Sequence, residues 1–143
     1  MKISQISVFL ENRKGRLYEV CNLLGQAGVN IRALHIAETT DFGILRIVVD
    51  QPEAALQTLH AHHFVASVTD IVAVQVSDRP GGLADVLRVL SQNDINVEYM
   101  YAFAEKKTDQ ALVVFRFEDP EKAIATLTQH GITIARQTDL LSP

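Results

Sequence analysis

The sequence is short of cysteine and of long apolar runs. Its 143 residues include one cysteine and four prolines, and only 6% are aromatic. A single cysteine cannot form an internal disulfide, which is typical of a reducing compartment. No apolar run approaches the roughly 20 residues that span a bilayer, and the opening "MKISQISVFLENRKG" lacks the apolar segment of a signal peptide. We expect a soluble, cytoplasmic protein that does not contact a membrane.

An excess of positive charge is also missing. Lys and Arg number 13 against 17 Asp and Glu, so the net charge is −4. This balance argues against a nucleic-acid partner, which needs a broad basic surface. The strands expected at "ISQISVF" and "IVAVQVS" also lack the stacking aromatics of an RNA recognition motif. Phe115 and Phe117 alternate toward the expected core, where the first half of the chain has Ile47 and Val49.

The chain contains a tandem repeat, and each copy takes about half of its length. When the sequence is shifted by 66 positions, "LENRKGRL" falls on "VSDRPGGL" and Asn30 falls on Asn96. Further along the shift becomes 68, so Pro52 falls on Pro120, and the second copy carries two extra residues near "EKKTDQ". Internal repetition indicates two copies of one small domain. We place the domains at 1–69 and 70–143, with the polar pair Thr69-Asp70 as the boundary.

Hydrophobic periodicity gives the same element order in each copy. An alternating strand at 6–10 precedes a helical stripe at 17–24, two extended segments at 30–38 and 43–50, a second helix opened by Pro52, and a final strand at 64–68. The second copy repeats this order, with Asp119 as a helix cap and a final strand at 132–136. Turns at Thr39–Asp41 and Lys106–Asp109 link the hairpins. The order βαββαβ, twice, predicts an α+β fold of two ferredoxin-like sandwiches with antiparallel sheets.

The loop between the first strand and the first helix is the candidate site. A helix start presents free N–H groups, and a glycine there lets an anion approach the backbone. Gly15 and the pair Gly81-Gly82 occupy that place, with Asn12 and Asp78 three residues earlier. Asn30 and Asn96 open the next strand, and we expect them close to the same loop. Two such side chains could hold the ammonium and the carboxylate of an amino acid. Turn and cap residues of purely structural use give the same pattern.

The motifs "LENRKGRL…GVNI" and "SDRPGGL…DINV" resemble the ACT domain, a family of small βαββαβ regulatory modules that bind amino acids. Its recurring signature is a strand ending in Asn or Asp, then x-P-G-x-L, a helix, and a G-[VI]-N-[IV] strand start. The second copy carries the D-R-P-G-x-L form, whereas Lys14 stands at the usual proline in the first. The resemblance covers essentially the whole chain.

This resemblance implies specific ligand contacts. In serine-sensing members the two asparagines of the motif contact the ligand, and those positions are Asn12 and Asn30, then Asp78 and Asn96. The other motif positions of the implied site are Gly15, Leu17, Ile31, Gly81, Gly82, Leu83 and Val97. A histidine that often precedes the first asparagine by two residues in that subgroup is replaced by Leu10 and Val76, which argues against serine.

The first copy also resembles the regulatory subunit of acetohydroxyacid synthase, which likewise ends a strand with L-E-N before a glycine turn. That resemblance implies an aliphatic ligand such as valine or leucine. ACT ligands sit between paired domains, and the pair here is internal, between the subunits of a homodimer, or both.

Other chemistry finds little support in the sequence. "HAHHF" at 60–64 has no neighbouring cysteine, so a solvated helix end is favoured over a metal site. Cys21 takes the place of Leu87 on the helical core stripe, which predicts a buried, inert thiol. We prefer a packing role for Tyr101, and His35, its counterpart, is open between packing and a pocket. No nucleophile–base pair or matched carboxylate pair indicates an enzyme, and no cofactor is expected.

We therefore expect a non-catalytic amino-acid sensor. A regulatory subunit of an amino-acid biosynthetic enzyme and a domain pair that only mediates association are the alternatives. A stable heteromeric partner would indicate the former, and failure to bind any amino acid would indicate the latter.

Overall fold

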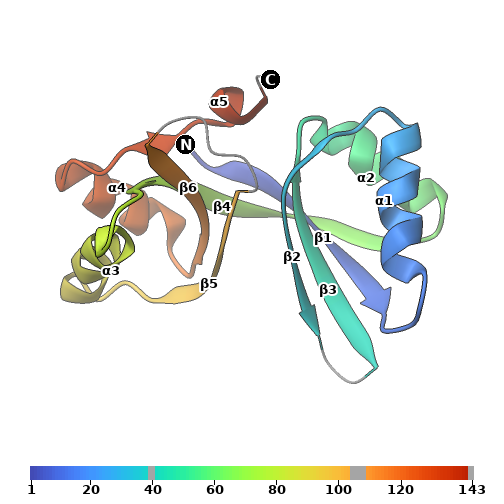
Figure 1. Cartoon of the computed structure of the whole chain (residues 1–143), viewed down its shortest axis with the longest axis horizontal. Helices are drawn as coiled ribbons and strands as arrows, with labels where there is room; N and C mark the ends of the chain where they lie inside the picture. Colours follow the sequence, from blue (N-terminus) through green and yellow to red (C-terminus); the bar gives the residue numbers. More distant parts are fainter. Residues whose placement is uncertain (39–40, 104–108, 142–143) are drawn as a thin grey trace. The chain divides into compact units, whose positions relative to one another are not determined.

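The computed structural model describes residues 1–38, 41–103 and 109–141. The chain divides into two compact units (Figure 1): the N-terminal unit, Ser4–Thr69, and the C-terminal unit, Asp70–Pro143 together with Met1–Ile3. Most of the two expected turns, Thr39–Asp41 and Lys106–Asp109, lies outside the described residues. Only Asp41 and Asp109 of these turns are described, and they directly precede strands.

The N-terminal unit has the predicted βαββαβ order. Its strand order is β2-β3-β1-β4, and β3 pairs antiparallel with both β1 and β2. In Figure 1, α1 and α2 lie on the same side of this sheet. The elements are β1 (Ile3–Glu11), α1 (Arg16–Gln26), β2 (Ile31–Glu38), β3 (Phe42–Val49), α2 (Pro52–Ala61) and the start of β4 (Val65–Ser77).

The C-terminal unit repeats this plan with strand order β7-β4-β6-β5, and its paired strands are antiparallel. Its elements are the rest of β4, α3 (Gly82–Gln92), β5 (Val97–Ala102), β6 (Gln110–Phe117), α4 (Pro120–Gln129), β7 (Ile134–Ala135) and α5 (Gln137–Leu141). The predicted pair of ferredoxin-like sandwiches with antiparallel sheets is thus confirmed.

Strand register reproduces the internal repeat. Ile6 lies opposite Ile47 in the N-terminal unit, and Val72 lies opposite Phe115 in the C-terminal unit. The second strand of each unit breaks register two residues after its start, at 31–33 and at 97–99. The two extra residues of the second copy therefore fall between β5 and β6.

Two details at the ends of the repeats differ from expectation. β4 runs without interruption across Thr69-Asp70, because the polar pair continues the extended chain. The final strand expected at 132–136 is only two residues long. It stops because the Asp139 carboxylate accepts a hydrogen bond from the Arg136 N–H at 2.9 Å, which starts the short helix α5.

Each unit has its own apolar core between the sheet and its two helices. The expected alternation of β1 is confirmed, because Ile6, Val8 and Leu10 are buried in the N-terminal core. Phe115 and Phe117 are fully buried in the C-terminal core, and their rings stack with centroids 5.4 Å apart. Their inward orientation is therefore confirmed, and neither ring is available to stack on a base.

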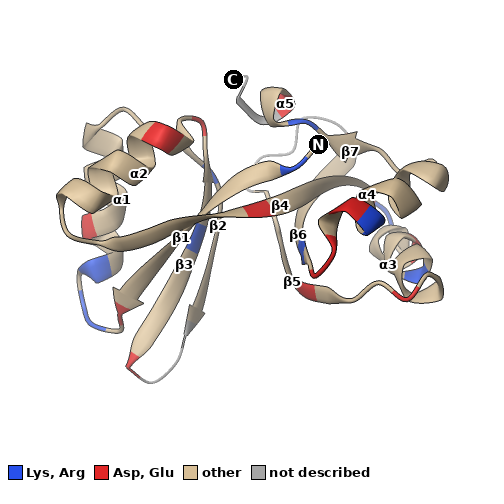
Figure 2. Cartoon of the chain, turned by 180° about the vertical axis from the view of Figure 1, so that it is seen from behind, with Lys and Arg blue, Asp and Glu red and all other residues tan. Residues whose placement is uncertain are grey.

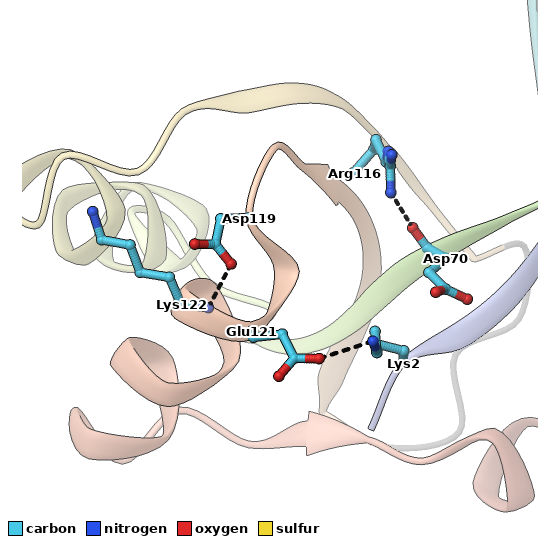
Figure 3. A network of polar contacts seen from close by, with 6 residues as sticks. All are labelled: Lys2, Asp70, Arg116, Asp119, Glu121 and Lys122. Atoms are coloured by element: carbon cyan, nitrogen blue, oxygen red, sulfur yellow. Dashed lines mark hydrogen bonds and ion pairs between the residues drawn. The ribbon is translucent and has the colours of Figure 1, made fainter.

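Helix starts follow the local sequence. Pro52 and Pro120 each begin a helix, as predicted. The predicted cap at Asp119 is confirmed, because its Oδ1 accepts a hydrogen bond from the Lys122 N–H at 3.1 Å (Figure 3). The counterpart of this residue, Gln51, makes no side-chain cap.

We expect Asp119→Ala to lower the free energy of unfolding by about 1 kcal/mol, because it removes a capping acceptor from a helix start. Urea unfolding followed by far-UV circular dichroism measures the change. Glu118→Ala, at the exposed residue next to it, is the control, and we expect a change below about 0.5 kcal/mol. Equal effects of the two substitutions would contradict the capping role.

The first residues of the chain are tied to the C-terminal unit. Lys2 Nζ donates a hydrogen bond to Glu121 Oε1 at 2.9 Å, near the start of α4 (Figure 3). This hydrogen bond, reinforced by the charge of Glu121, raises the pKa of the Lys2 ammonium. Nearby, Arg116 Nη1 donates to the Asp70 carbonyl at 2.8 Å. Met1–Ile3 therefore belong with the C-terminal unit, although the repeat places them in the first copy.

Candidate functional site

The β1–α1 loop and the β4–α3 loop share one backbone design. The Arg13 N–H donates to the Glu11 carbonyl and the Glu19 N–H to the Gly15 carbonyl, at 2.8 and 3.0 Å. The same bonds recur at the equivalent positions of the second repeat, at Arg79 and at Asp85. Each loop is therefore a tight turn that leads straight into a helix.

A glycine in the left-handed region starts each of these helices. Gly15 has φ +91° and Gly81 has φ +84°, which residues with a side chain rarely adopt. No side chain caps either helix. In α1 the N–H groups of Leu17 and Tyr18 are those that a helix start leaves without an intrahelical partner. Both helix starts therefore have a glycine in the left-handed conformation and no side-chain cap.

A cavity of about 230 Å³ lies beside this loop in the N-terminal unit. Gly43 of β3 lines this cavity, and Leu17 of α1 contributes an apolar side chain from the first helical turn. A Cβ atom on Gly43 would come within 3.3 Å of the Ala37 carbonyl oxygen, so the strands pass closely there. The lining residues are Leu10, Glu11, Asn12, Arg13, Leu17, Ile36 and Gly43.

Charges of both signs meet at this cavity. The Arg13 guanidinium lies 3.7 Å from the Glu11 carboxylate, and both side chains are more than half exposed. Figure 2 shows acidic and basic positions close together where β1 ends and the loop begins. The Asn12 backbone N–H donates to the Asp41 carbonyl at 2.8 Å, which fixes the loop against the start of β3. The lining thus combines a cation, an anion and an amide with three aliphatic side chains.

Only part of the predicted site comes together. Asn12 and Leu17 line the cavity, and Gly15 holds the turn beside them without lining it. Asn30 lies elsewhere, because its carbonyl accepts a hydrogen bond from the Asp50 N–H and its own N–H donates to the Asp50 carboxylate. Asp50 follows β3, whereas Asn12 bonds to the residue before β3.

Asn12 and Asn30 therefore lie at opposite ends of an eight-residue strand, roughly 25 Å apart. The expectation that Asn30 lies close to the loop is wrong, and Ile31 lies at the same end of the sheet as Asn30, opposite Val49. The helix α1 returns the chain along the sheet, so β2 begins at the end where β1 begins.

The C-terminal unit shows the same separation. The Asp78 N–H bonds to the Asp109 carbonyl just before β6, whereas Val97 lies opposite Phe117 at the far end of β6. Asn96 and Val97 are therefore remote from Gly81, Gly82 and Leu83, and the expectation that Asn96 lies close to the loop is wrong here too. Leu83 is 37% exposed, like its counterpart Leu17 at 39%.

Five lining residues of the N-terminal cavity were not among the predicted site residues: Leu10, Glu11, Arg13, Ile36 and Gly43. A glycine inside a strand often marks a close backbone approach, so Gly43 could have been noticed. Glu11 and Arg13 flank Asn12 in the sequence, so the geometry of the turn alone would have identified them as lining residues. Ile36 lies on β2, and its contribution depends on the register between β2 and β3.

Other candidate residues have ordinary surroundings. His60 Nε2 and His62 Nδ1 each lie 2.9 Å from a backbone carbonyl, and the described residues contain no cluster of three potential metal ligands. Cys21 is half-buried rather than fully buried, and burial raises the pKa of its thiol. Tyr101 is buried and His35 is half-buried. Within the described ranges, no helix has the length and apolar character needed to cross a membrane.

Known proteins provide an independent test of the fold and the family. The family "ACT domain pair" matches residues 1–142. Protein BT0572 from Bacteroides thetaiotaomicron has 40% identity and a TM-score of 0.93, over 100% of this chain and 98% of its own. The regulatory subunit of aspartate kinase from Thermus thermophilus has 19% identity and a TM-score of 0.63, over 88% and 91%.

The corresponding subunit from Thermus flavus has 16% identity and a TM-score of 0.60, over 88% of this chain and 90% of its own. At such low identity these two subunits show a shared fold. No curated protein sequence matches the chain. The match over nearly the whole length, with the tandem folds already described, shows that the chain belongs to the ACT domain family as an ACT domain pair.

Proposed function

We propose that the protein is a non-catalytic sensor that binds an aliphatic L-amino acid in the cavity beside the β1–α1 loop. The observation that carries this proposal is the lining itself, where opposite charges stand next to aliphatic side chains. The Glu11 carboxylate suits an ammonium group, and the Arg13 guanidinium suits a carboxylate. Membership of the ACT domain family supports the same ligand class.

The size and apolar part of the cavity favour a small aliphatic side chain. Its volume of about 230 Å³ lies below the roughly 300–1,000 Å³ of sites for drug-sized ligands. Leu10, Leu17 and Ile36 supply aliphatic contacts around the glycine of β3. An amino acid held by its charged groups at the loop would place its side chain against these three residues.

A sensor acts only if another molecule responds to the ligand-bound state. A ligand shifts an equilibrium only as far as its affinities for two states differ. The proposal therefore includes a homodimer or a partner enzyme whose state the amino acid changes. Light scattering with and without ligand tests the dimer, and affinity capture from native lysate with each amino acid tests the enzyme.

The first test is a thermal-shift panel of the twenty amino acids. A ligand at 100 times its Kd adds about 2.7 kcal/mol to the stability of the folded chain, which for a chain of 143 residues raises Tm by about 5–10 °C. We expect valine, leucine or isoleucine to respond. Calorimetry then gives the affinity of the responding amino acid.

Variants locate the site. Gly43→Val places a branched side chain on the cavity floor, and we expect it to weaken binding at least about tenfold. Ala111→Val is the matched control, because Ala111 occupies the position of Gly43 in the C-terminal unit. Arg13→Ala tests the charge contact without adding volume, and we also expect about a tenfold loss. Unchanged affinity in both Gly43→Val and Arg13→Ala would refute this site.

A further inference from the structure

The two repeats differ sharply at the first helical residue after the loop. Arg16 begins α1, and Gly82, its counterpart in the second repeat, begins α3. The loops around them share their backbone hydrogen bonds, except that the turn is tighter before Gly82. The Gly82 N–H lies 2.9 Å from the Arg79 carbonyl, whereas the Arg16 N–H lies 3.3 Å from that of Arg13.

In the N-terminal unit the Arg16 side chain fills the space beside the helix start. Its guanidinium lies over the Phe64 ring, 4.5 Å from the centroid, which is a cation–π contact. It also donates to the Glu19 carboxylate at 2.8 Å and lies 3.9 Å from that of Glu11. The Arg16 side chain is only 19% exposed, so in this unit the space beside the helix start holds a cationic group and its aliphatic stem.

In the C-terminal unit the space that corresponds to the outer part of the Arg16 side chain is a cavity of about 380 Å³. The inner part is closed, because a Cβ atom on Gly82 would stand 1.9 Å from the Ser77 carbonyl oxygen. Its lining includes Ser77, Asp85 and Ile132, which are the counterparts of the three residues that Arg16 contacts. Gly82 and Gly131 supply no side chain where the N-terminal unit has Arg16 and His63. The neutral polar side chains of the lining are Gln75, Ser77, Gln110 and Thr133.

We infer that this cavity binds a small ligand with a guanidinium or ammonium group on an aliphatic stem, in the place that the outer part of the Arg16 side chain occupies in the other unit. Asp85 receives the cationic group as Glu19 receives that of Arg16. Ile132 and Val86 contact the stem, and the neutral polar lining accepts the remaining N–H groups. This site lies within one unit and is separate from the proposed amino-acid cavity.

The present partners of Asp85 do not prevent such binding. Arg79 pairs with Asp85 Oδ2, and Arg88 lies 3.4 Å from Oδ1. Both arginine side chains are more than half exposed, and ion pairs at such positions contribute little because water and salt screen them. A ligand cation that enters beside Gly82 would exchange with them at the carboxylate.

The test is a titration of the full ¹⁵N-labelled chain with n-propylguanidinium chloride at constant ionic strength. We expect saturable amide shifts centred on residues 82–86 and 131–133. Asp85→Asn should weaken binding about tenfold or more, because it removes a charge-assisted contact. Glu19→Gln is the matched control, and binding at 82–86 should be unchanged in it. Saturable shifts there with sodium propionate in place of the cation, or no shifts with either, would overturn the inference.

A second variant tests the comparison between units directly. Arg16→Ala removes the guanidinium and its stem from the N-terminal unit. In this variant n-propylguanidinium should also shift the amide signals of residues 16–20, and it should raise Tm because it restores the lost contacts. Failure of the probe to act on Arg16→Ala, together with unchanged binding in Asp85→Asn, would overturn the assignment. Agmatine and L-arginine are titrated in the same way. Tighter binding of agmatine would indicate a polyamine-like ligand, and tighter binding of L-arginine would indicate an amino acid.

Discussion

Phe115→Ala is expected to lower the free energy of unfolding by about 4 kcal/mol, within the range for deleting a buried phenylalanine side chain. Phe115 is fully buried in the C-terminal core and stacks on Phe117, with an angle of 5° between the ring planes. The surrounding side chains relax only in part around such a deletion and leave a cavity. Urea unfolding followed by far-UV circular dichroism measures the loss.

Phe9→Ala is the matched aromatic control. Phe9 lies on β1, is 45% exposed, and touches the Phe42 ring at a centroid distance of 4.9 Å. Little apolar surface is lost there, so we expect a change below about 1 kcal/mol. Similar effects of the two substitutions would mean that Phe115 is not a core residue and would reopen an aromatic binding surface on β6.

The fold was predictable because several local signals agree with one another. The repeat sets the element order, the alternation of β1 identifies its buried face, and Pro52, Pro120 and Asp119 mark helix starts. Each signal acts over a few residues, and the fold satisfies all of them together. The short β7 could not be predicted, because a hydrogen bond from Arg136 to Asp139 ends the strand.

The candidate site was predictable at one end of the sheet only. Asn12 and Leu17 are close together in the sequence, so the loop alone brings them to the same cavity. Asn30 is separated from Asn12 by the whole of α1, and its position depends on the direction in which this helix returns the chain. Ile36 and Gly43 reach the cavity through strand register, which spacing along the sequence does not reveal.

The sequence "DRPGGL" likewise does not distinguish its two glycines. Gly81 is required by its backbone, because φ is +84°. Gly82 is required by its surroundings, because a Cβ atom there would stand 1.9 Å from the Ser77 carbonyl oxygen and 2.9 Å from its carbon. The second requirement exists only because the chain turns back so tightly after β4.

Gly82→Ala is therefore expected to cost about 3 kcal/mol of unfolding free energy, at the upper end for forcing a methyl group into a filled space. Both atoms in the way belong to the backbone, so no side chain can rotate to relieve the overlap. The loop would have to move and weaken its bonds from Gly82 to Arg79 and from Asp85 to Gly81, now 2.9 and 3.0 Å long. Urea unfolding of the variant gives the cost.

Gly15→Ala separates this steric effect from backbone strain. Gly15 has φ +91°, but no atom lies within 4 Å of an added Cβ, so the expected cost is about 1–2 kcal/mol from the left-handed conformation alone. Arg16 shows that the wider N-terminal turn accepts a side chain at the position of Gly82. If Gly82→Ala costs no more than Gly15→Ala, the C-terminal loop relaxes to that wider turn. The tight approach to Ser77 would then be a consequence of glycine at that position rather than a requirement of the fold.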